Sequence, residues 1–201
     1  MVSEVADSLI GALAAVTTAV AGVPAILVGG VAVSLLGRPR FTRDIDALVD
    51  LDEARWPALL AAARAVDIVP RIDDPLEFAR RSRVLLLRHE PSQIDVDVIL
   101  GGLPFECAAV RAGQPHRLGN LTVPLPRVED LMIMKAVAQR PQDLLDLAGL
   151  LETHPDADLA IVRQWVREFS VVATLPTLIE ELERIVSRVQ GRPGPPAAPP
   201  R

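Results

Sequence analysis

The chain has 201 residues, which is enough for one or two small domains with a buried core, and half of these residues are hydrophobic. The formal net charge is −5 and aromatic residues make up 3%, with no Tyr. These values argue against an extended basic surface that binds nucleic acid and against an array of base-stacking side chains. Cys107 is the single cysteine, so an internal disulfide is excluded, an ordinary zinc site is not expected, and we predict a cytoplasmic protein.

The beginning of the chain is apolar but does not have the pattern of a membrane span. Residues 8–37 contain no charged side chain. They are preceded by Glu4 and Asp7 instead of Lys or Arg, and Pro24 interrupts them. We therefore expect a buried helix over residues 3–21, then a buried strand, and no membrane as a partner.

A short strand and a glycine turn come next. Residues 25–28 are a purely apolar run, typical of a buried strand. Gly29 and Gly30 follow at once, where a turn brings the backbone close to another group. A short helix is expected over residues 31–36.

The following strand carries two acids. Residues 44–49 alternate, so the carboxylates of Asp44 and Asp46 leave the same face. Two such carboxylates repel each other unless a cation lies between them, and a divalent metal, most often magnesium where phosphates are present, is the usual solution. The N–H groups of Gly29 and Gly30, at a helix N-terminus, favour a bound phosphate. The stretch therefore predicts a metal and phosphate site.

A second pair of acids lies on a later expected strand. Residues 93–100 alternate so that Asp95 and Asp97 share one face, while the apolar residues between them point to the core. A carboxylate from this strand, placed beside the first pair, could complete a two-metal clamp. The alternative is that both acids are solvated on a half-exposed sheet.

Lys135 is the only lysine in the chain. It lies on a helix expected over residues 127–139, beside the packed stripe of that helix. A compact point charge suits a triphosphate tail. Asp143 and Asp146 share a face of the next helix; Asp143 can simply complement the helix dipole, and Asp146 is a candidate site residue.

The remaining chain predicts helices and a tail. Residues 157–169 and 175–189 have the pattern of amphipathic helices. Residues 191–201 hold five Pro and no large apolar side chain, so we expect them to be disordered. We predict a domain over residues 1–125 and a helical part over residues 126–190.

Two separate motifs resemble one family. Gly29-Gly30, a short helix and Arg40–Asp46 (R-F-T-R-D-I-D) resemble the signature of the polymerase-β-type nucleotidyltransferases. They are most similar to the AbiEii/AbiGii-like branch, whose members include toxins of type IV toxin–antitoxin pairs. Glu129–Lys135 (E-D-L-M-I-M-K) followed by Arg140–Leu147 (R-P-Q-D-L-L-D-L) looks like the second signature of that branch.

The resemblance also concerns the second acid pair. Its third carboxylate normally stands on a strand that is followed by Pro, an aromatic residue and Glu, and here Asp97 has that position before Pro104–Glu106. Asp95 stands where the family often has Arg. This departure leaves open which of the two acids binds metal.

The resemblance implies an α/β nucleotidyltransferase fold with a small mixed sheet and a helical C-terminal part. It implies transfer of a nucleotide from a nucleoside triphosphate to an acceptor hydroxyl, with two Mg²⁺ or Mn²⁺ ions. The expected acceptor is RNA, particularly the 3′ end of tRNA, and the expected partner is a cognate antitoxin. The implied catalytic residues are Asp44, Asp46, Asp97 and Lys135, of which the three acids bind metal, and the nucleotide-binding residues are Gly29, Gly30, Arg43, Lys135 and Asp146.

Two other functions agree with the same residues. One is nucleotidyl transfer to a small molecule such as an antibiotic, or to a partner protein, which suits the acidic chain better. The other is a catalytically inactive nucleotide-binding module or antitoxin, against which the intact set of acids and Lys135 argues.

Overall fold

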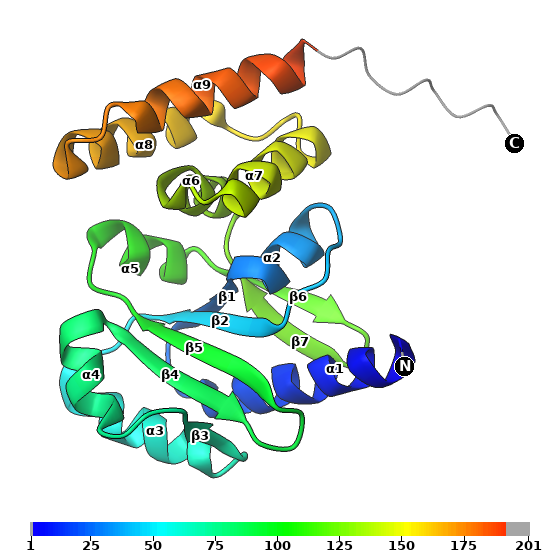
Figure 1. Cartoon of the computed structure of the whole chain (residues 1–201), viewed down its shortest axis with the longest axis vertical. Coiled ribbons are helices and arrows are strands. Elements are labelled where there is room, and N and C mark those ends of the chain that lie inside the picture. Colours follow the sequence, from blue (N-terminus) through cyan, green and yellow to red (C-terminus); the bar gives the residue numbers. More distant parts are fainter. Residues whose placement is uncertain (1, 192–201) are drawn as a thin grey trace, which may run out of the picture. The chain divides into compact units, whose positions relative to one another are not determined.

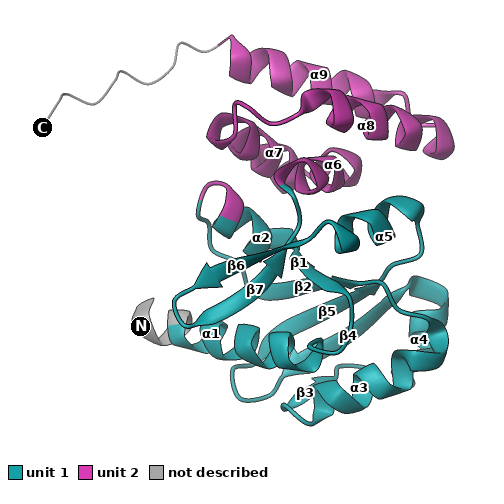
Figure 2. Ribbon diagram, turned by 180° about the vertical axis from the view of Figure 1, so that it is seen from behind, with its two compact units in different colours: residues 1–35, 39–127 teal, residues 36–38, 128–201 magenta. Residues whose placement is uncertain are grey.

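The computed structural model describes residues 2–191, and for residues 2–6 the backbone alone. Its contacts divide the chain into two compact units (Figure 2). Unit 1 comprises the residues up to Leu35 and Pro39–Arg127, and unit 2 comprises Leu36–Arg38 and the residues from Val128 onward. The domain boundaries expected from the sequence remain a proposal. The tail expected to be disordered lies outside the described residues except for Gly191.

Unit 1 combines helices with a five-stranded sheet and a separate hairpin (Figure 1). Its helices are α1 (Val2–Ala19), α2 (Gly29–Leu36), α3 (Trp56–Arg64), α4 (Pro75–Ser82) and α5 (Pro104–Arg111), with a 3₁₀ turn η1 (Glu53–Arg55). Its strands are β1 (Ala25–Val28), β2 (Asp44–Val49), β3 (Ile68–Pro70), β4 (Val84–His89), β5 (Ile94–Leu100), β6 (Gln114–Leu118) and β7 (Leu121–Leu125).

The five-stranded sheet is mixed, and its order is β1-β2-β5-β4-β3. The strands β2 and β5 are parallel, and the other neighbouring pairs are antiparallel. The hairpin pairs β6 with β7 across Gly119 and Asn120, residues that are common in tight turns. The predicted α/β fold class with a small mixed sheet is therefore confirmed.

The expected alternation along the central strands is observed. On β5, Val96, Val98 and Leu100 are buried, whereas Asp95 and Asp97 are partly exposed. Helix α1 contacts β5 and α3, so apolar packing stabilises the sheet from one side. The acids consequently occupy the opposite face of the sheet.

Glycine is required where β1 turns into α2. Helix α2 begins at Gly29, two residues earlier than the sequence predicts, and Gly29 has a φ of +62°. A Cβ at this position would overlap the carboxylate of Asp46, and one on Gly30 would lie 2.9 Å from Cβ of Thr42. The two glycines thus let the start of the helix approach β2 closely.

Unit 2 is helical. Its helices are α6 (Val128–Ala138), α7 (Pro141–Thr153), α8 (Leu159–Ala173) and α9 (Thr177–Gln190). Pro141 occupies the first turn of α7, where it removes no helical hydrogen bond, and Asp158 caps α8 by accepting from the N–H groups of Ala160 and Ile161. Among the described residues, no helix is both long enough and apolar enough to cross a membrane.

The substitutions Gly29→Ala and Gly119→Ala form a matched pair that tests the close approach. Both glycines have a φ near +60°, so an alanine at either one costs roughly 1–2 kcal/mol of backbone strain. A Cβ at residue 119 meets no atom within 4 Å, whereas one at residue 29 overlaps Asp46. We expect Gly119→Ala to lower the melting temperature by a few degrees, since about 1 kcal/mol corresponds to about 2–4 °C in a chain of this size.

We expect Gly29→Ala to lower the melting temperature further, because strain and overlap add. Circular dichroism during heating measures both variants against the wild-type chain. Equal losses in the two variants would contradict the packing of Gly29 against Asp46.

Candidate active site

Four carboxylates meet on the exposed face of the sheet in unit 1. The parallel register places Asp44 opposite Asp95 and Asp46 opposite Asp97. Side chains two residues apart on a strand point to the same face, so both acid pairs face the same way. Neighbouring strands lie about 4.8 Å apart, which brings these like charges close enough to need cations.

Two arginines supply positive charge to the acids of β5. Arg71, directly after β3, donates from one terminal nitrogen to Asp95 Oδ2 at 2.9 Å and from the other to Asp97 Oδ1. Arg88, opposite Asp95 in the register, donates from Nε to Asp95 Oδ1 at 2.8 Å. Asp95 therefore has two arginine partners, whereas Asp97 shares one of them.

The strand β2 presents its acids differently. Thr42 Oγ1 donates to Asp44 Oδ1 at 2.7 Å. Ser34, on α2, fixes the loop that leads into this strand, because its Oγ lies 2.9 Å from the carbonyl oxygen of Arg40 and accepts from Arg40 N at 3.3 Å. Asp46 packs against Gly29 at the start of α2, so the N-terminus of that helix adjoins the acids.

The electrostatics of Asp97 are those of a site residue. Burial raises the pKa of the Asp97 carboxyl above its ordinary value. Arg71 opposes that shift, while the charges of Asp44 and Asp95 add to it. A carboxylate in this environment gains from an additional cation.

The donor set suits a hard divalent cation, although the side chains do not enclose one. Within residues 2–191, no three acidic, His or Cys side chains are gathered so that they could hold a metal ion as they stand. Asp44, Asp46 and Asp97 offer carboxylate oxygens from adjacent strands, which is the ligand type that Mg²⁺ and Mn²⁺ prefer. In the structure, one oxygen of Asp44 accepts a hydrogen bond from Thr42, and one oxygen of Asp97 accepts from Arg71.

Lys135 and Asp146 lie in unit 2, in a buried ionic cluster. Lys135 Nζ is 2.8 Å from Asp143 Oδ1 and 3.0 Å from Asp146 Oδ2, and its side chain is only 6% exposed. Arg140 Nε donates to Asp143 Oδ2 at 2.6 Å. Burial raises the pKa of the Asp143 carboxyl, but the hydrogen bonds from Arg140 and Lys135 outweigh it, so this pKa lies below its ordinary value. Lys135 is thus inside the helical packing and not merely beside it.

The loop before β2 carries an exposed aromatic side chain. Phe41 is 65% exposed, and the guanidinium of Arg43 lies over its ring at 5.9 Å from the centroid. Residues 80–83 also carry arginines, but these arginines contact neighbouring side chains of the protein. Arg80 pairs with Glu53 and Glu77, and Arg83 stacks on Trp56. Accordingly, the loop at Phe41 is the better candidate for contact with a substrate.

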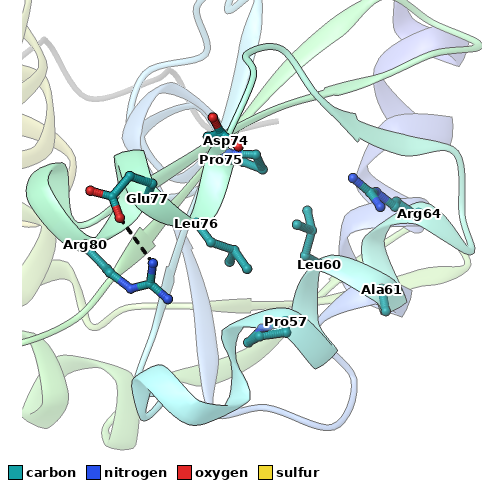
Figure 3. Close-up of a pocket in the computed structure, with 9 residues that line it drawn as sticks. All are labelled: Pro57, Leu60, Ala61, Arg64, Asp74, Pro75, Leu76, Glu77 and Arg80. Atoms are coloured by element: carbon teal, nitrogen blue, oxygen red, sulfur yellow. Dashed lines mark hydrogen bonds and ion pairs between the residues drawn. The ribbon is translucent and has the colours of Figure 1, made fainter.

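A groove of about 700 Å³ lies elsewhere in unit 1, between α3 and α4 (Figure 3). Pro57, Leu60 and Leu76 form its apolar part, and Glu77 pairs with Arg80 at its rim (Figure 3). None of the site residues expected from the sequence lines it.

Sequence reasoning missed the two arginines that bind Asp95. The tight turn between β4 and β5 carries a signal for Arg88, since it pairs residue 88 with residue 95. No comparable signal marks Arg71, because its position depends on how β3 pairs with β4 across a helix. Thr42 belongs to the recognised motif, but its hydrogen bond to Asp44 was not foreseen.

Two of the solved structures that match this chain are similar to it over most of its length. The antibiotic-resistance factor ANT(2'')-Ia, in a solution structure described as revealing substrate-regulated conformation dynamics, is similar over 89% of this chain and 98% of that chain, with a TM-score of 0.56 and 12% identity. JHP933 from Helicobacter pylori is similar over 92% of this chain and 90% of that chain, with a TM-score of 0.48 and 16% identity. A comparison with curated proteins gave no match.

A family model described as nucleotidyl transferase AbiEii toxin, type IV TA system, matches residues 12–193. This match includes both motifs on which the resemblance rests, and it spans nearly all of the described chain. The chain therefore belongs to the AbiEii family of nucleotidyltransferase toxins.

Proposed function

We propose that this nucleotidyltransferase is metal-dependent and transfers a nucleotide to the 3′-terminal hydroxyl of an RNA, in particular tRNA. The observation that carries the metal-dependent part is the in-register placement of Asp44 with Asp95 and of Asp46 with Asp97, beside the start of α2. No sheet needs four carboxylates on one face for packing alone, since their mutual repulsion opposes folding.

In this proposal Asp44, Asp46 and Asp97 hold Mg²⁺ or Mn²⁺, which supplies charge neutralisation to the triphosphate and to the attacking oxygen. The N–H groups at Gly29 and Gly30 receive a phosphate at the start of α2. The acceptor oxygen forms a bond to the α-phosphorus, the bond from that phosphorus to the β-phosphate oxygen breaks, and pyrophosphate leaves. Asp97 accepts the proton of the hydroxyl.

Asp97 is preferred over Asp95 as the third metal ligand because of their partners. Both oxygens of Asp95 accept hydrogen bonds from arginines, whereas Arg71 is the one arginine bound to Asp97 in the described part of the chain. A carboxylate already neutralised by two guanidinium groups gains less from a metal ion. Asp95 is then a structural partner of Arg71 and Arg88.

The RNA acceptor is supported by the loop that precedes β2. An exposed aromatic ring beside a guanidinium is suited to stacking a base, and every base has a face that can stack there. Arg43, which the sequence predicts as a nucleotide-binding residue, is one half of this pair. Family membership also implies an antitoxin as a protein partner.

A small-molecule acceptor is the second candidate. The fold is similar to that of an antibiotic-resistance factor, and the net charge of −5 does not favour binding a polyanion. The identity of 12% to that factor is too low to transfer its substrate.

The metal site is tested by asparagine substitutions, which keep the shape of the side chain and remove its charge. We expect Asp44→Asn, Asp46→Asn and Asp97→Asn each to lower kcat by about a hundredfold or more. Asp95→Asn, on the same strand face as Asp97, is the matched control and should weaken turnover much less. If Asp97→Asn had a kcat within a few-fold of wild type and the same melting temperature, Asp97 would not be a metal ligand.

Lys135 is proposed to neutralise the triphosphate while its bonds to Asp143 and Asp146 hold Nζ in place. Lys135→Met should raise the KM for the triphosphate, and it should also lower stability by roughly 3–5 kcal/mol, because buried carboxylates lose their cation. The double variant Lys135→Met/Asp146→Asn relieves part of the repulsion. If it restored both the melting temperature and the KM, Lys135 would be a structural residue alone.

The acceptor is tested by incubating total RNA with each labelled nucleoside triphosphate. We expect the tRNA band to be labelled, with one nucleotide preferred, and Phe41→Ala to lower labelling about tenfold, since stacking one base contributes roughly 1–3 kcal/mol. Leu103→Ala, which removes another exposed apolar side chain of unit 1, is the control and should have no effect. Labelling of a small molecule or a co-expressed protein, together with no labelling of tRNA by any of the four nucleotides, would contradict the RNA acceptor.

A further inference from the structure

Arg71 binds two acids at once from a fixed position next to the sheet. Its backbone N donates to the carbonyl oxygen of Leu86 at 2.9 Å, which extends the pairing of β3 with β4 by one residue. Its side chain is 24% exposed, and its two terminal nitrogens bind Asp95 and Asp97. Its Nε is buried without a hydrogen-bond partner in the structure. The two carboxylates are therefore the hydrogen-bond partners of this guanidinium in the structure.

Neutralising Asp95 does not by itself require Arg71. Arg88 binds the other oxygen of Asp95 at 2.8 Å and lies directly opposite it in the sheet. What Arg71 adds is a cation at Asp97, which binds no other arginine in the described part of the chain. Of the two carboxylates that Arg71 binds, Asp97 is therefore the one whose charge depends on it.

We propose that Arg71 is an internal counter-ion of Asp97, which a divalent metal ion displaces when it binds. This inference depends on the proposed function, in which Asp97 is a metal ligand. A guanidinium and a metal ion repel each other and compete for the same carboxylate, so Arg71 lowers the affinity of the site for metal. In the metal-free chain it relieves the repulsion of Asp97 by Asp44 and Asp95.

Asp95 makes this exchange compatible with the fold. When the terminal nitrogen on Asp97 is released, the other one remains bound to Asp95 at 2.9 Å. Arg71 can thus leave the metal ligand without leaving the site, and Asp95 is the residue that retains it. This assigns a role to an acid that carries no metal in the proposed mechanism.

The experiment titrates Mn²⁺ into the full chain without nucleotide, by calorimetry or by electron paramagnetic resonance of free Mn²⁺. We compare wild type with Arg71→Gln and with the matched control Arg88→Gln, which removes an equal charge that contacts Asp95 alone. We expect Arg71→Gln to bind Mn²⁺ roughly tenfold more tightly. A positive charge in contact with a carboxylate lowers its affinity for a proton by about one pKa unit or more, and we expect a similar change in its affinity for a metal ion. Arg88→Gln should change the affinity much less.

Melting without and with Mn²⁺ supplies a second measurement. Without metal, Arg71→Gln should have a lower melting temperature than wild type. Added Mn²⁺ should raise the melting temperature of Arg71→Gln more than that of wild type. If Arg71→Gln does not fold, Arg71→Lys keeps the charge but cannot span both carboxylates, and it should still bind Mn²⁺ more tightly than wild type.

Three results would overturn the proposal. Equal or weaker Mn²⁺ binding by folded Arg71→Gln shows that Arg71 does not compete with metal. An equal gain in Arg88→Gln shows a general charge effect in place of a specific contact. No Mn²⁺ binding by either the wild-type chain or folded Arg71→Gln removes the metal site itself, so it overturns the proposed function together with this inference.

Discussion

The parallel pairing of β2 with β5 is the constraint on which the acidic site depends. Because side chains alternate along a strand, a slip of this register by one residue would turn Asp95 and Asp97 toward the core and Val96 toward solvent. Burial of Val96 and Val98 at 1% and 4% exposure opposes such a slip. Apolar packing on one face of the sheet thus fixes the position of the charges on the other face.

The contacts around β2 extend this constraint to the start of α2, where a phosphate is proposed to bind. Ser34 ties α2 to the loop before β2, and Thr42 in that loop holds Asp44. Gly29 lets the start of the helix meet Asp46. Each contact is a short-range hydrogen bond or a steric requirement, so together they hold the helix start and the two acids as one unit, which is the kind of pre-organisation that electrostatic catalysis uses.

The sequence predicts the features that local rules determine. Alternation predicted which faces carry Asp44, Asp46, Asp95 and Asp97, and Pro24 marked the region after the first helix. The start of α2 was predicted two residues late, since the helix begins at Gly29, which lies against Asp46 of β2. Arg71 depends on the pairing of distant strands, and the burial of Lys135 depends on how α6 meets α7, so neither follows from spacing alone.

Asp95 and Asp97 are alike in sequence but differ in the positive charges around them, and the separate roles proposed for the two acids rest on this difference. The sequence separates them only by their context, whereas the sheet separates them by their neighbours, since Arg88 lies opposite Asp95 and Leu86 lies opposite Asp97. Burial raises the pKa of the Asp97 carboxyl, and this acid shares its one arginine with Asp95. The same fold therefore produces one acid that is already neutralised and one that gains from a further positive charge, which is the asymmetry that a metal site built on a strand needs.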